Sequence, residues 1–156
     1  MTEYKIEHKD AFNITAYGTT IEMPYESIPA QKSDFWKAIE ADGRWAKLKS
    51  VAKNGLEFAV NEAINGAMWY YSGVESDKEI EDATRLIEFP DGDYLILKGS
   101  APQPGQLFAQ LEGAAFSEVL GSLSDYAYTG GPNTSVQTDQ KDGMFYGEIW
   151  IPLTKK

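Results

Sequence analysis

The feature that most constrains the fold of this chain is an echo between its two halves. Residues 6–18 correspond to residues 87–99, and residues 35–40 correspond to residues 107–112. Near the end of each half, Met68-Trp69-Tyr70 is matched by Met144-Phe145-Tyr146. Similarity at such a long period is typical of an internal duplication. We therefore expect one domain over residues 1–156, with repeat 1 at about 3–75 and repeat 2 at about 84–153.

The local pattern predicts the same element order in each half: strand, strand, helix, strand, strand. Asn65-Gly66 predicts a tight hairpin, and Asp42-Gly43 predicts a break in the first helix. The acidic segment 75–84 is expected to connect the halves. The predicted fold class is α+β, with an antiparallel sheet, helices on one face and two pseudo-twofold-related halves. Such halves are expected to form a ligand cleft between them.

Composition excludes several functions. The formal net charge of −10 repels phosphate backbones, so we expect no direct nucleic-acid binding. No apolar run is long enough to span a bilayer and no signal peptide is apparent, so we expect no membrane association and a cytoplasmic location. The chain has no cysteine and one histidine, His8, which we expect to be exposed or capped. No metal site and no cofactor are predicted, because ligand spacing and a phosphate-binding loop are both missing.

Glu148 interrupts an otherwise apolar strand near the end of the chain. Alternation of side chains places it on one face with Tyr146 and Trp150. The other face carries Phe145, Ile149 and Ile151. A carboxylate among aromatic rings is costly unless it meets a cation or a proton, so the pattern indicates a site. The alternative is a glutamate on an edge strand that reaches water. The aligned position in the first half is Ser72, so we expect only one wall of the cleft to be charged.

The chain resembles the GyrI-like small-molecule-binding domain, which also forms the effector-binding part of AraC-type and MerR-type multidrug regulators. The resemblance is carried by Tyr4-Lys5-Ile6-Glu7, by residues 87–94 and, most specifically, by Glu148-Ile149-Trp150-Ile151-Pro152-Leu153. It begins near the third residue, which leaves no room for a helix-turn-helix, so a stand-alone form is expected. The resemblance implies an aromatic cleft in which a buried glutamate faces a lipophilic, cationic, drug-like small molecule.

Glu148 matches the glutamate of that family, and the resemblance places several aromatic side chains around it. The predicted ligand-binding residues are Glu148, Tyr146, Trp150, Tyr126, Tyr94, Trp36, Trp69 and Tyr70. The favoured function is a binding module for such compounds rather than an enzyme.

Two alternatives stay open at this point. Some members of the family resemble hydrolases that open strained cyclopropane rings in toxic natural products. In such an enzyme Glu148 would orient or deprotonate water while Tyr126 or Tyr146 donates a proton. Other members inhibit DNA gyrase by binding the enzyme, which implies a protein partner, and a homodimer is a further open arrangement.

Overall fold

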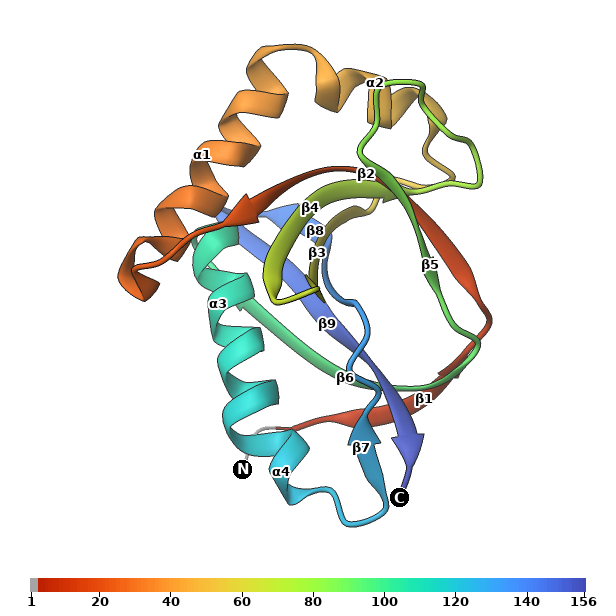
Figure 1. Cartoon of the computed structure of the whole chain (residues 1–156). Helices are drawn as coiled ribbons and strands as arrows, with labels where there is room; N and C mark the ends of the chain where they lie inside the picture. The colour runs from red at the N-terminus through yellow and green to blue at the C-terminus, as the bar shows by residue number, and fades with distance from the viewer. Residues whose placement is uncertain (1–2) are drawn as a thin grey trace.

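A computed structural model describes residues 3–156 and shows an α+β fold with a strongly curved sheet (Figure 1). The strands are β1 (Lys5–Lys9), β2 (Phe12–Ile21), β3 (Glu57–Ile64), β4 (Ala67–Glu75), β5 (Arg85–Phe89), β6 (Gly92–Ala101), β7 (Tyr126–Tyr128), β8 (Asn133–Lys141) and β9 (Met144–Lys155). The helices are α1 (Ile28–Ala41), α2 (Arg44–Val51), α3 (Pro104–Ala114) and α4 (Leu120–Ser122). A 3₁₀ turn (Tyr25–Ser27) precedes α1, and a π-helical turn (Ala115–Val119) joins α3 to α4.

The order of strands in the sheet has a twofold pattern. Eight strands follow the order β1-β6-β9-β8-β3-β4-β2-β5, all pairs are antiparallel, and β7 pairs with β9. Strands β1, β2, β3 and β4 of the first half correspond to β5, β6, β8 and β9 of the second. Replacing every strand by its counterpart gives the same order read in reverse. The outer strands cross over, because β1 pairs with β6 of the second half and β5 pairs with β2 of the first. The predicted fold class is therefore confirmed, while the exact repeat boundaries stay a prediction.

The turns and breaks lie where the sequence indicates. Asn65 and Gly66 both have positive φ angles, 50° and 82°, which suits a tight hairpin between β3 and β4. Asp142 and Gly143 make the equivalent turn between β8 and β9, with φ of 53° and 77°. Gly43, at φ 88°, separates α1 from α2. Local turn chemistry therefore sets the hairpin registers of both halves.

Helices cover one face of the sheet, and the other face encloses a second hydrophobic core. Helix α3 packs on a cluster that includes Leu97, Ile149 and Ile151, and α1 with α2 covers one that includes Tyr17 and Val74. The opposite, inner face curls around a second core. Its buried members include Ile14, Phe58, Tyr71, Tyr94, Ile96, Val136 and Trp150. Among residues 3–156, no helix combines the length and the hydropathy that crossing a membrane requires.

The expected equivalence of Ser72 and Glu148 is wrong. Ser72 pairs with Ala59 and lies on the helix-covered face, whereas Glu148 pairs with Val136 on the inner face. Glu148 follows Gly143 by as many residues as Tyr71 follows Gly66, so the turns align Glu148 with Tyr71. An error of one residue in a strand exchanges its two faces, which is why the sequence alignment misplaced the partner.

Candidate ligand-binding cleft

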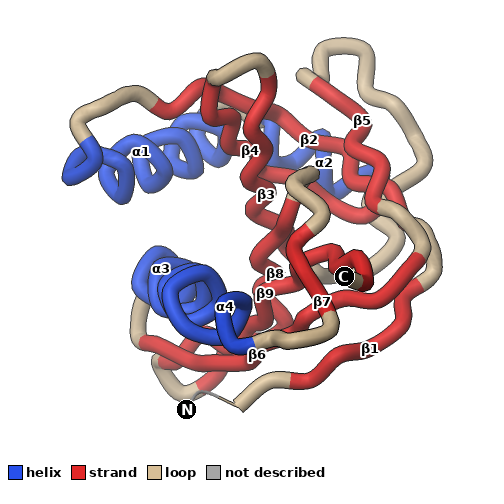
Figure 2. Tube along the Cα trace, turned by 60° about the horizontal axis from the view of Figure 1, so that its bottom comes forward, coloured by secondary structure: helices blue, strands red, loops and turns tan. Residues whose placement is uncertain are grey.

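A cleft of about 940 Å³ lies between α1 and α3, over the helix-covered face of the sheet. Figure 2 shows these two helices opposite each other on the same side of the curved sheet. The cleft is lined by Tyr25, Glu26, Ile28, Pro29, Lys32, Ser33, Trp36, Glu40, Glu57, Tyr70, Pro104, Gly105, Phe108, Ala109, Glu112, Gly113, Phe116, Ser117, Gln137, Gln140 and Phe145. Its volume falls within the range of about 300–1,000 Å³ found for drug-sized ligands.

Several aromatic side chains line the cleft. Trp36 on α1 and Phe108 on α3 stand at positions that align in the two repeats, and Tyr70 on β4 lies beneath them. The Trp36 Nε1 donates a hydrogen bond to the Tyr70 hydroxyl at 2.6 Å. Burial raises the pKa of Tyr70 well above its usual range, so this hydroxyl stays protonated at neutral pH. The hydrogen bond therefore joins α1, which forms one wall of the cleft, to β4, which forms its floor.

Carboxylates outnumber cations in the cleft. Glu26, Glu40, Glu57 and Glu112 line it, and Lys32 is the one basic side chain among the described residues that do so. Glu57 is half-buried at the start of β3, and burial, followed by the nearby Glu40 carboxylate, raises its pKa above the ordinary value of 4.5. The raised pKa means that the ionised form of Glu57 is disfavoured in the cleft. A cation that binds beside it stabilises this ionised form.

Lys32 compensates part of this negative charge. Its ammonium lies 3.6 Å from Glu112 Oε1 and donates a hydrogen bond of 3.2 Å to Asn61 Oδ1. Asn61 Nδ2 in turn donates to Glu112 Oε1 at 3.1 Å. The same ammonium stands 4.8 Å from the centroid of the Tyr70 ring, a cation–π distance. Glu57 and Glu26 have no comparable ion pair within the described residues.

Of the residues predicted to bind ligand, the structure brings Trp36 and Tyr70 into this cleft. The predicted anion lies elsewhere: Glu148 belongs to the inner face, where Trp150 Nε1 donates to its Oε1 at 2.9 Å. Glu148 Oε2 lies 3.9 Å from Lys98 Nζ, and the side chain is 20% exposed. The expected common face of Glu148 and Trp150 is therefore present, but it is turned away from the cleft between the helices. Whether Glu148 contacts a ligand stays a prediction.

The other predicted aromatic residues lie outside the α1–α3 cleft. Tyr94 is buried in the inner core and donates to the carbonyl of Pro90 at 2.6 Å. Trp69 stacks on Tyr71 with ring centroids 5.9 Å apart. Tyr126 donates to Asp93 Oδ2 at 3.1 Å, and the Tyr146 ring lies 5.3 Å from Lys141 Nζ. The ammonium of Lys9 lies 3.9 Å from the Trp150 ring. These contacts give each ring a structural partner.

Sequence reasoning missed Phe108, Lys32 and the carboxylates Glu26, Glu40, Glu57 and Glu112 as site residues. A signal for three of them was present, since residues 35–40 align with residues 107–112. Trp36 and Phe108 occupy one aligned position, Glu40 and Glu112 another, and all four line the cleft. Equivalent side chains on two facing helices mark a surface between repeats. Glu57 has no such signal.

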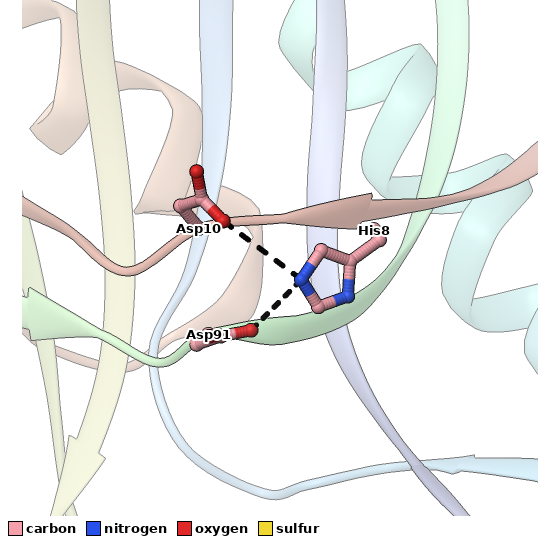
Figure 3. A group of neighbouring side chains, drawn as sticks. All are labelled: His8, Asp10 and Asp91. Atoms are coloured by element: carbon pink, nitrogen blue, oxygen red, sulfur yellow. Dashed lines mark ion pairs between the residues drawn. The ribbon is translucent and has the colours of Figure 1, made fainter.

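A separate polar cluster lies where the β1–β2 and β5–β6 turns meet (Figure 3). His8 Nε2 is 2.9 Å from Asp91 and 3.9 Å from Asp10, and His8 Nδ1 is 3.7 Å from Asp93. This is the one group with metal-ligand spacing among the residues that the structure describes, and its three closest members are exposed. Each ring nitrogen lies within 4 Å of a carboxylate oxygen, so the side chains of this cluster contact one another.

Comparisons with solved structures agree with this architecture. SAV2435 bound to tetraphenylphosphonium has a TM-score of 0.80 at 16% identity, covering 98% of this chain and 94% of that one. The integron cassette protein VCH_CASS2 from Vibrio cholerae has a TM-score of 0.68 at 9% identity, with 97% and 95% covered. The EcmrR C-terminal domain has a TM-score of 0.61 at 12% identity, with 100% and 99% covered. At these identities the likeness establishes the fold alone, which is the α+β arrangement that the resemblance to GyrI-like domains implies.

No curated protein matches the chain significantly. The family comparison is positive and covers nearly the whole fold, from β1 to β9: the match spans residues 5–153. That span contains both helices of the cleft and all of the strands except the last two residues of β9. The chain therefore belongs to Cass2, the family of integron-associated effector binding proteins.

Proposed function

We propose that this protein binds lipophilic, cationic, drug-like molecules in the cleft between α1 and α3. The observation that carries the proposal is the charge of an aromatic cleft: four glutamates line it and one lysine opposes them. An anionic ligand would meet repulsion there, while a neutral ligand would leave only Lys32, already paired with Glu112, to oppose four carboxylates. A cation removes that cost.

The aromatic walls supply the rest of the binding energy. A cation between ring faces gains about 0.5 to 2 kcal/mol per ring, and its apolar groups gain about 25 cal/mol for each Å² buried. Trp36, Tyr70 and Phe108 offer faces or edges to such a ligand. Flat apolar contact tolerates many shapes, so selection acts on charge and lipophilicity more than on particular substituents. SAV2435, which shares the fold, has been solved with tetraphenylphosphonium, a cation of this class.

The test is a tryptophan-fluorescence titration with tetraphenylphosphonium and with neutral triphenylphosphine oxide. Two matched variants separate the candidate anions: Glu57→Gln in the cleft and Glu148→Gln on the inner face. We expect Glu57→Gln to lose about 1.4 kcal/mol, a tenfold weaker affinity for the cation, because an amide cannot compensate charge. Glu148→Gln retains an acceptor for Trp150 Nε1 and should bind as the wild type does. The neutral compound should respond to neither substitution.

Two other outcomes of the titration are informative. Loss of binding in Glu148→Gln alone would move the site to the inner face and support the role that the sequence resemblance implies. No cation binding in any of the three proteins would refute the proposal. Mass analysis of the recovered ligand separates binding from turnover, since a binding module returns the compound intact.

A further inference from the structure

We propose that Lys32 is a built-in competitor of the ligand: its ammonium occupies the cation position of the cleft and sets which cations can enter. This inference rests on the proposed function of the cleft. The contacts already described place the ammonium where an incoming cation would gain most, 4.8 Å from the Tyr70 ring centroid and 3.6 Å from Glu112 Oε1. Aromatic face and carboxylate are the two groups that recognise an organic cation.

Lys32 is largely shielded from solvent, and defined partners hold its ammonium in place. Its side chain is 19% exposed, and the hydrogen bond to Asn61 fixes the ammonium beside Glu112. Asn61 holds Glu112 as well, so the three side chains form one network across the α1–α3 cleft. Lys32 is also the one base among the described residues of this lining. The network therefore presents a filled cation position in a cleft that otherwise carries three further carboxylates.

A second cation cannot share this position without repulsion. Two unit charges about 4 Å apart repel each other strongly at the effective dielectric near a protein surface. The lysine stem is flexible, so the ammonium can leave for water and release Tyr70 and Glu112 to the ligand. A small hydrated cation gains too little to displace it. A large aromatic cation also buries surface against Trp36 and Phe108, and that gain offsets the displacement.

Lys32 thus acts as a specificity-determining residue that favours lipophilic cations over small ones. The test compares wild type, Lys32→Met, which keeps most of the length of the side chain without its charge, and Lys32→Arg, which keeps the charge. The probes are tetraphenylphosphonium, tetramethylammonium and neutral triphenylphosphine oxide. We expect Lys32→Met to bind tetraphenylphosphonium about tenfold more tightly, because one repelling charge is removed. It should also gain measurable affinity for tetramethylammonium, while Lys32→Arg resembles wild type.

Triphenylphosphine oxide serves as the control for an intact cleft, since its affinity should be the same in all three proteins. The double variant Lys32→Met with Glu112→Gln should lose the gain, because Glu112 is the carboxylate that Lys32 releases. If wild type binds tetraphenylphosphonium and Lys32→Met binds it no more tightly, the competitor role is wrong and the cleft function stands. If neither protein binds it, both proposals are wrong. If Lys32→Met fails to fold, Lys32→Gln replaces it, with the same expected gain.

Discussion

Trp36 and Tyr70 are joined by a hydrogen bond of 2.6 Å from the indole Nε1 to the phenol oxygen. One partner comes from α1 and the other from β4, so the bond connects a helix to the sheet beneath it. Tyr70 is only 2% exposed, and few water molecules can compete for its hydroxyl. The bond therefore holds the aromatic wall of the cleft against its floor.

Breaking this bond should lower stability and loosen the cleft. We expect Tyr70→Phe to destabilise the protein by about 1 kcal/mol, since the half-buried indole N–H loses its acceptor. Trp36→Phe should cost at least as much because it also removes apolar contact. The check is chemical denaturation of both single variants and the double variant. The double variant should cost clearly less than the sum of the two single losses; simple additivity would show that the hydrogen bond contributes nothing.

Cation binding should weaken in acid because of Glu57. Its pKa is raised above 4.5 in the folded state, first by burial and then by Glu40, so the folded protein holds this proton more tightly than the unfolded chain. Deprotonation of Glu57 therefore reduces stability as the pH rises through its folded pKa, and a bound cation offsets that loss.

Affinity for tetraphenylphosphonium should consequently fall as the pH is lowered towards 4.5, because Glu57 takes up its proton above that value. Isothermal titration calorimetry in two buffers of different ionisation enthalpy would report proton release on binding within this window. Glu57→Gln should flatten that part of the pH profile. An unchanged profile in this variant would assign the acid dependence to another carboxylate.

Gly73 on β4 should not tolerate a side chain. A Cβ atom at this position would lie 2.6 Å from Ile14 Cγ2 and 2.7 Å from the backbone oxygen of Thr15, and the second of these cannot move aside easily. We expect Gly73→Ala to lower the free energy of unfolding by about 1 to 3 kcal/mol through overpacking. Gly55→Ala is the matched control, because nothing lies within 4 Å of its added Cβ. Equal stability of the two variants, measured by thermal unfolding, would contradict the close β2–β4 approach.

Much of the fold could be predicted from local chemistry. Alternation identified the strands, and turn residues such as Asn65 and Gly66 fixed the hairpins. The aligned helices could be recognised because each carries its apolar residues at helical spacing. The crossing of β1 and β5 to the opposite halves could not, since strand pairing between distant segments leaves no local signal.

The candidate site was harder to predict for a physical reason. Alternation put Glu148 and Trp150 on one face, and their hydrogen bond bears this out. It could not tell which face the helices cover, because that depends on how α3 packs against Ile149 and Ile151. The helices bury the more apolar face, so the cleft formed between α1 and α3 rather than over Glu148. Its anions come from the helices and from the start of β3.

The crossed outer strands also determine how far the chain can be divided. In this protein β1 completes the sheet of the second half, and β5 completes that of the first. A polypeptide that carried only one repeat could pair its outer strand, β1 or β5, with its own sheet. Otherwise it would leave the edge of β2 or β6 unpaired. Two such polypeptides could lend each other their outer strands and close both edges. We therefore expect a half-length version to be stable as a strand-swapped dimer, with the cleft at the boundary between its subunits.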